Sequence, residues 1–105
     1  MLFRSVIAVG AHPRPLKMEG AAYLTTSRQF LELAHLPLRI VFIGGGFISF
    51  EFAHFATHLC RNKSRQTTIL QVGPRPLKPF DAGMVSYLST ASEDAGIRID
   101  RKSVV

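Results

Sequence analysis

A run of three glycines is the part of this sequence whose residue types and spacing could support chemistry. Gly44, Gly45 and Gly46 follow a short stretch of β-branched and aromatic residues, and Ser49 lies three residues further on. This spacing fits the pattern G-x-G-x-x-[small]. There the first glycine allows a tight turn, the second leaves room beside the backbone, and the third residue lets a helix pack closely. The pattern predicts a loop that holds the pyrophosphate of a dinucleotide, and an ordinary structural turn is the alternative.

The residues after the glycines supply the hydrogen-bond donors that such a loop needs. Apolar residues recur with the period of a helix that has one apolar face, at Ile48, Phe52, Phe55 and Leu59. The first amides of a helix have no partner within it, and they lie at the positive end of the helix dipole. We therefore expect the backbone amides of Phe47 and Ile48 to bind the pyrophosphate.

The end of the next predicted strand is where nucleotide-binding folds of this kind contact the adenosine ribose. Gln71 stands there, and its side chain can hydrogen-bond a ribose hydroxyl although it carries no charge. Arg75 and Lys78 follow, and either cation could bind the 2′-phosphate of NADP. Charges on a solvent-exposed loop are the alternative for both. The residues thus leave the choice between NAD and NADP open.

Other reactive side chains on the predicted helix carry less weight. Glu51, His54 and His58 would share one face and could in principle chelate a metal, but a fourth ligand is not evident. We interpret this face as polar surface or as a packing surface for another domain, and we expect no metal. Cys60 is the only cysteine, and we interpret it as a small buried residue at the helix end. A single cysteine excludes an internal disulfide and fits a reducing cytoplasm.

The elements around the glycines alternate between strands and helices. Arg39–Ile43, Thr67–Val72 and Ile97–Ile99 are predicted as strands from their β-branched and apolar residues. A helix after the glycines, closing near Cys60, separates the first two strands. The order strand, helix, strand, helix, strand predicts an α/β fold, a truncated Rossmann-like βαβαβ unit with a parallel sheet.

The second helix of this unit has clear end signals. Asp81 is a good N-cap, and Gly96 is placed to end a helix that runs to about Ala95. Its apolar face is predicted to hold Met84, Leu88 and Ala91.

The region before the unit is predicted as an N-terminal strand and a linker. Phe3–Val9 is an apolar run of strand type, and prolines follow it. Thr26 and Gln29 have the spacing of a capping box, which predicts a short helix through Ala34, and Pro37 ends it.

Composition limits the classes of partner. The 105 residues make one small domain at most, with a formal net charge of +6. The basic residues are dispersed, and the one local cluster, from Arg61 to Arg65, has no aromatic residues and is interpreted as part of a solvated loop. We therefore do not expect a nucleic-acid partner. No apolar run approaches the length of a membrane span, so we expect no membrane partner.

Three segments, taken together, resemble the class I pyridine nucleotide-disulfide oxidoreductases, the family of glutathione reductase, dihydrolipoamide dehydrogenase and mercuric reductase. Val6 to Pro13 is similar to the stretch where the family's chain leaves its flavin domain. Leu36 to Ala53 is similar to the opening of the family's nucleotide domain, and Gly73 to Asp81 is similar to the run G-x-R-x-L…F-D before its next helix.

The resemblance implies a function and roles for two side chains. Residues 1–16 match the end of an FAD domain, 17–37 a linker with a short helix, and 38–105 an NAD(P)-binding half-domain. Phe47 corresponds to an aromatic residue over the nicotinamide pocket. Glu51 corresponds to a carboxylate that pairs with a lysine of the flavin domain. In a complete enzyme of this kind, hydride passes from NAD(P)H to FAD.

The resemblance also implies parts that lie outside this chain. The family's flavin motif and redox cysteine pair would lie before Met1, and its dimerisation domain after Val105. The implied partners are a dinucleotide and either a separate flavin domain or a second subunit. The rival interpretations are a non-catalytic fragment of such an enzyme and, from another class, a small basic nucleic-acid-binding protein.

Overall fold

The computed structural model describes residues 2–59 and 64–101 of the chain. The chain divides into two compact units, Met1–Glu32 and Leu33–Val105, and each is considered by itself. Cys60 and the basic residues Arg61 and Lys63 lie outside the described residues. Arg65 is the one basic residue of this cluster that the structure describes. It is half-buried, and its guanidinium donates to the carbonyl of Pro37.

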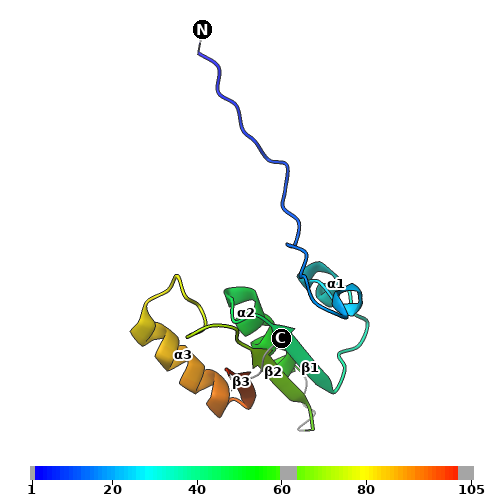
Figure 1. Ribbon diagram of the computed structural model, residues 1–105, viewed down its shortest axis with the longest axis vertical. Coiled ribbons are helices and arrows are strands. Elements are labelled where there is room, and N and C mark those ends of the chain that lie inside the picture. The colour runs from blue at the N-terminus through cyan, green and yellow to red at the C-terminus, as the bar shows by residue number, and fades with distance from the viewer. Residues whose placement is uncertain (1, 60–63, 102–105) are drawn as a thin grey trace. The chain divides into compact units, whose positions relative to one another are not determined.

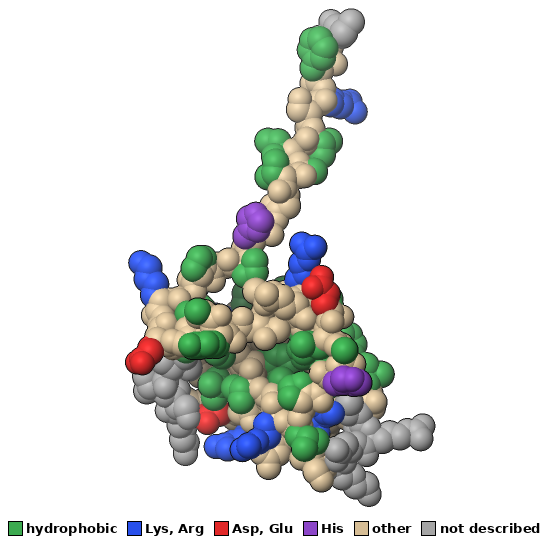
Figure 2. Space-filling model, turned by 90° about the vertical axis from the view of Figure 1, so that its right-hand side faces the viewer, with side chains coloured by type: hydrophobic (Ala, Val, Ile, Leu, Met, Phe, Trp, Pro, Cys, Tyr) green, Lys and Arg blue, Asp and Glu red, His purple; other side chains and the backbone are tan. Residues whose placement is uncertain are grey.

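The first unit begins with an extended segment, and the prediction of a strand at Phe3–Val9 is wrong. The apolar side chains of this segment are 87–96% exposed: Leu2, Phe3, Val6, Ile7 and Val9. A strand exists only through hydrogen bonds to a neighbouring strand, and no strand of the described part of the chain pairs with this segment. Figure 2 shows it as a narrow column of atoms with isolated hydrophobic side chains along it.

The rest of the first unit holds two short helices. A 3-10 helix, η1, covers Ala21–Tyr23, and α1 covers Ser27–Leu31. The predicted capping box is confirmed: the amide of Gln29 donates to the Thr26 hydroxyl at 3.3 Å, and the amide of Thr26 donates to the Gln29 side chain at 2.9 Å. The helix is shorter than predicted, because Glu32 already stands at its C-cap.

The second unit is a parallel sheet with two helices, which confirms the predicted α/β fold. The strands lie in the order β1-β2-β3, and both pairs are parallel. Figure 1 shows the three strands side by side, with both helices next to them. The bounds are β1 Arg39–Ile43, α2 Phe47–Leu59, β2 Gln66–Leu70, α3 Ala82–Asp94 and β3 Ile97–Asp100.

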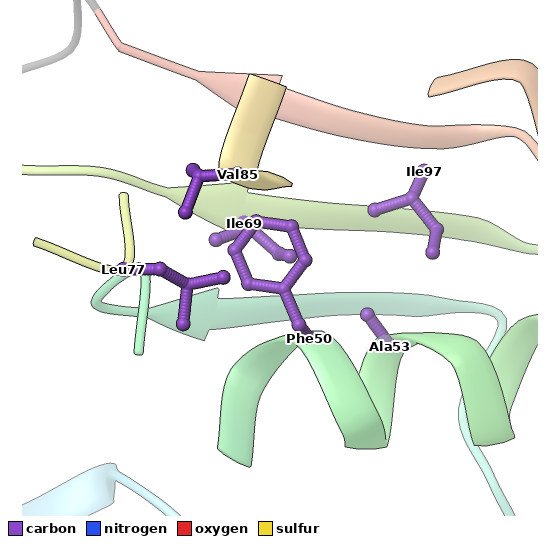
Figure 3. Close-up of a cluster of buried hydrophobic side chains, with 6 residues drawn as sticks. All are labelled: Phe50, Ala53, Ile69, Leu77, Val85 and Ile97. Atoms are coloured by element: carbon purple, nitrogen blue, oxygen red, sulfur yellow. The ribbon is translucent and has the colours of Figure 1, made fainter. Parts of the chain in front are cut away.

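Both helices pack on the same face of the sheet. Side chains from α2, β2, the loop after β2, α3 and β3 form one buried cluster, made of Phe50, Ala53, Ile69, Leu77, Val85 and Ile97. Figure 3 shows these side chains pointing toward one another. On the opposite face Val41 is 56% exposed, because successive residues of a strand point to opposite faces. The core of the unit is therefore one-sided.

The predicted apolar faces of the two helices are largely wrong. In α2 the buried residues are Phe50, Phe52, Ala53 and Ala56, whereas the predicted Ile48, Phe55 and Leu59 are exposed. In α3 the buried residues are Val85, Ser89 and Ser92. Of the predicted face, Leu88 packs partly buried against the core, whereas Met84 is 70% exposed and Ala91 is exposed. Small residues, two alanines in α2 and two serines in α3, are buried beside larger apolar ones, Phe50 and Phe52 in α2 and Val85 in α3. Other apolar side chains of the helices, such as Phe55 and Met84, stay exposed.

The end signals of α3 are confirmed. The carboxylate of Asp81 accepts a hydrogen bond from the amide of Met84 at 3.0 Å, and Gly96 follows the C-cap with a φ of +96°. None of the helices in residues 2–59 and 64–101 is long and apolar enough to cross a membrane.

Replacing Ile69 with alanine is expected to remove a large part of the stability of the second unit. Ile69 is 0% exposed on the central strand, and truncation of such a side chain costs about 2–5 kcal/mol. Urea denaturation followed by circular dichroism measures the loss. Val41→Ala, on the exposed face of β1, is the control and should cost at most about 1 kcal/mol. Equal losses at both positions would contradict a one-sided core.

Candidate functional site

The chain turns sharply at the first of the three glycines. The amide of Gly44 donates to the carbonyl of Leu70 at 2.9 Å, which extends the β1–β2 ladder by one bond. Gly44 then adopts a φ of +98°, a conformation that side-chain-bearing residues rarely adopt. The turn therefore depends on glycine at this position because of its backbone angle.

Gly45 is buried and depends on glycine for a different reason. A Cβ built on Gly45 would overlap Oε1 of Gln71 and would lie 2.8 Å from Cβ of Pro76. The carbonyl of Gly45 accepts a hydrogen bond from the amide of Leu77 at 2.8 Å. The loop after β2 thus lies directly on the glycine turn. The motif treats this middle position as variable, and the only signal in the sequence was that a third glycine occupies it.

Gly46 faces open space in front of α2. A Cβ built there would meet no atom within 4 Å, and no unusual φ requires glycine at this position. The carbonyl of Gly46 accepts the first helical hydrogen bond, from the amide of Phe50 at 3.3 Å. The next residues, Phe47 and Ile48, are exposed, and Ser49 is half-buried. The free space lies where the first amides of α2 begin.

Gln71 points into its own loop. Its side chain is buried, and Nε2 donates to the carbonyl of Val72 at 2.8 Å and to the carbonyl of Arg75 at 3.0 Å. These two bonds use both hydrogens of the amide. Only Oε1 remains as an acceptor, and it lies over Gly45. The role of Gln71 as a ribose ligand remains a prediction.

The two basic residues of this loop differ in their surroundings. The guanidinium of Arg75 donates to the carbonyls of Leu77, Lys78 and Phe80, at 3.4, 2.9 and 2.8 Å. Arg75 therefore braces the loop. Lys78 is exposed. The structure thus leaves Lys78 as the more accessible cation of the pair.

An apolar groove of about 580 Å³ runs between α2 and α3. Both side chains to which the resemblance assigns a role at the nicotinamide, Phe47 and Glu51, line this groove. Glu51 is its only acidic lining residue in the described part of the chain. The full lining is Phe47, Phe50, Glu51, His54, Phe55, Leu77, Phe80, Met84, Val85, Tyr87 and Leu88. The sequence motifs did not indicate the contribution from α3, because it arises only when the helices pack side by side.

One of the two histidines of α2, His54, lines this groove. The hydroxyl of Ser92 donates to the carbonyl of Leu88 at 2.8 Å, so Nε2 of His54, 3.0 Å away, is assigned as the donor to that hydroxyl. His58 donates from Nδ1 to the carbonyl of His54 at 2.9 Å, and the two rings stack with centroids 5.5 Å apart. Burial lowers the pKa of His54, and the neighbouring His58 lowers it further.

One protein-family model and several curated proteins match most of this chain. The family model of pyridine nucleotide-disulphide oxidoreductases matches residues 4–105. Glutathione reductase of Nostoc sp. is 34% identical over 100 residues, which cover 95% of this chain and 21% of that protein. Dihydrolipoyl dehydrogenase of Mycoplasma genitalium is 30% identical, with 90% and 21% covered. Mercuric reductase of Lysinibacillus sphaericus is 31% identical, with 91% and 17% covered. The chain spans about a fifth of the length of these relatives.

The stability of the chain is expected to fall as the pH drops below the ordinary pKa of histidine, because of His54. In the folded chain the pKa of His54 lies below its ordinary value of 6.5, to which unfolding returns it. Above that pH both states hold a neutral ring and the contribution to stability is fully present. As the pH falls through the lowered pKa, the unfolded chain binds the proton first and this stability is lost.

The free energy of unfolding measured in urea between about pH 8 and about pH 5 tests this dependence. His54→Gln keeps an amide donor for Ser92 and should flatten the profile. His12→Gln, in the extended N-terminal segment, is the matched control and should leave the profile unchanged. Parallel profiles for His54→Gln and the unaltered chain would contradict the assignment.

Proposed function

Because this chain belongs to the pyridine nucleotide-disulphide oxidoreductase family, we propose that it binds the dinucleotide NADH or NADPH at the turn between β1 and α2. The observation that carries the proposal is the open space at Gly46, where a Cβ would meet no atom within 4 Å. Open space next to the first amides of a helix is the arrangement that a pyrophosphate needs.

The residues of the turn fit this ligand in three ways. Gly44 reverses the chain directly after the strand, so that the helix begins at the carboxyl end of the sheet. This is the edge at which open parallel α/β sheets bind their ligands. Gly46 leaves the approach free, and the amides of Phe47 and Ile48 would donate to the pyrophosphate. Ser49, half-buried in the first turn of α2, lets the helix stay close to the sheet.

The two ends of the dinucleotide would meet different surroundings. At the nicotinamide end, Phe47 offers an aromatic surface and Glu51 a carboxylate, and both line the same groove. At the adenosine end, we propose Lys78 as the cation that would meet a 2′-phosphate, because it is exposed whereas Arg75 is engaged with three carbonyls. Gln71 and Arg75 hold the loop after β2, and this loop borders the adenosine end of the proposed site.

In a complete relative, the bound nucleotide supplies hydride for reduction of FAD. The part that we propose for this chain is to bind and orient the nucleotide. The groove walls would exclude water from the nicotinamide, and Glu51 would pair with a cation of a flavin-bearing partner, either a separate domain or a second subunit. The compartment that we propose is the cytoplasm.

Replacing Gly46 with leucine is expected to abolish nucleotide binding while leaving the fold intact. The new side chain would project into open space, so no buried contact is lost, but it would occupy the approach to the helix amides. We expect the Kd for NADH and NADPH to rise at least ~100-fold, which corresponds to about 2.8 kcal/mol. Isothermal titration calorimetry with both nucleotides measures the change, and circular dichroism checks the fold.

Ser86→Leu, on the exposed surface of α3, is the control for an added leucine and should keep the Kd of the unaltered chain. Unchanged affinity of the Gly46→Leu variant would overturn the proposed site. Absence of binding by the unaltered chain would instead favour a fragment without cofactor affinity. Affinity for DNA that falls steeply with salt would favour the nucleic-acid-binding interpretation.

A further inference from the structure

Gln71 occupies a position in which its whole side chain is used by the protein itself. Its backbone amide donates to the carbonyl of Asp100 at 2.8 Å, which ties the end of β2 to β3. Its side-chain amide donates to the carbonyls of Val72 and Arg75. Its Oε1 fills the space over Gly45, where a Cβ would overlap it.

We propose that Gln71 is a positioning residue that sets the conformation of the glycine turn, and that it does not read the ribose. The inference rests on the proposed function, because the turn that Gln71 positions is the proposed pyrophosphate site. Its action passes through two contacts. The side chain packs against Gly45, and the loop that it ties down brings the amide of Leu77 within 2.8 Å of the Gly45 carbonyl.

The backbone of Leu77 gives independent support for a loop held under constraint. Leu77 has a φ of +50°, a left-handed conformation that is uncommon for leucine and persists only where the surroundings enforce it. Its side chain is buried in the core cluster beside Phe50 and Val85 (Figure 3). Its amide is held by Gly45. The side chain of Leu77 thus connects the loop to α2, and its amide connects the loop to the turn that precedes α2.

Only a side chain with two amide hydrogens and a compact acceptor satisfies this environment. A glutamate would place a carboxylate against two carbonyl oxygens without donors, which is unfavourable in a buried position. A methionine would fill a similar volume but would leave the carbonyls of Val72 and Arg75 without these donors. For Gln71 to donate to a ribose, it would have to give up a bond that holds the loop.

The positioning role and the ribose-ligand role predict different patterns of nucleotide affinity. A residue at the adenosine ribose contacts the group in which NADH and NADPH differ, so its loss changes the ratio of their affinities. A residue that shapes the pyrophosphate turn acts on a group that both nucleotides share. Its loss weakens both by the same factor.

The test compares Gln71→Met with Gln66→Met in the full chain. Gln66 is an exposed glutamine at the start of β2, the strand that Gln71 directly follows, so it controls for the substitution itself. NMR hydrogen exchange follows the amide of Leu77, and calorimetry gives the Kd for NADH and for NADPH. For Gln71→Met we expect faster exchange of this amide and a roughly tenfold rise in both Kd values, as the loss of about two hydrogen bonds implies. The ratio of the two Kd values should stay within about twofold.

A third variant separates positioning from a loss of overall stability. Ile97→Val removes one methyl group from the buried core without touching the loop, so it should lower stability and keep both Kd values. All Kd values are measured where each variant is folded by circular dichroism. If Gln71→Met does not fold, Gln71→Asn, which keeps the amide on a shorter side chain, is measured against the same criteria.

Three results would overturn the inference. They are unchanged exchange of the Leu77 amide, unchanged affinity for both nucleotides, and a change of more than about threefold in the ratio of the two Kd values, which would make Gln71 a ribose ligand. If the unaltered chain binds neither nucleotide, the proposed function fails. The Leu77 amide alone then decides whether Gln71 holds the turn.

Discussion

The close approach of two backbone segments at the carboxyl end of the sheet is the constraint on which the rest of the second unit depends. The loop after β2 can lie on the turn after β1 only because Gly45 has no side chain. Once Leu77 donates to Gly45, the loop, the turn and the start of α2 form one connected piece. The buried side chain of Leu77 carries this connection into the core.

The three glycines stand in three different surroundings. Gly44 is needed for its backbone angle and Gly45 for the space that Gln71 and Pro76 occupy, whereas a side chain at Gly46 would project into open space. The first two requirements belong to the fold and would exist in a chain with no ligand. Nothing in the described residues requires a glycine at Gly46, and this is the position at which we propose that the ligand approaches.

The groove between α2 and α3 follows from the way each helix packs. Small residues are buried in both helices, alanines in α2 and serines in α3. The larger Phe50 and Val85 belong to the core cluster and also line the groove, together with exposed apolar side chains such as Phe55 and Met84. His54 bridges the helices at one side through Ser92. The polar and apolar parts of the candidate site thus come from one packing arrangement.

Local signals in the sequence determined the order of strands and helices, the capping box at Thr26, the N-cap at Asp81 and the glycine turn, because each depends on residues close together in the chain. The N-terminal strand and the buried faces of the helices were predicted wrongly, since both depend on what packs against them. The roles of Gln71 and Arg75 at a nucleotide stay predictions. Their types suit a nucleotide, and only the tertiary structure turned their donors onto nearby carbonyls. The loop conformation that presents those carbonyls is held by the hydrogen bond from the amide of Leu77 to Gly45, a contact between distant segments that no local pattern records.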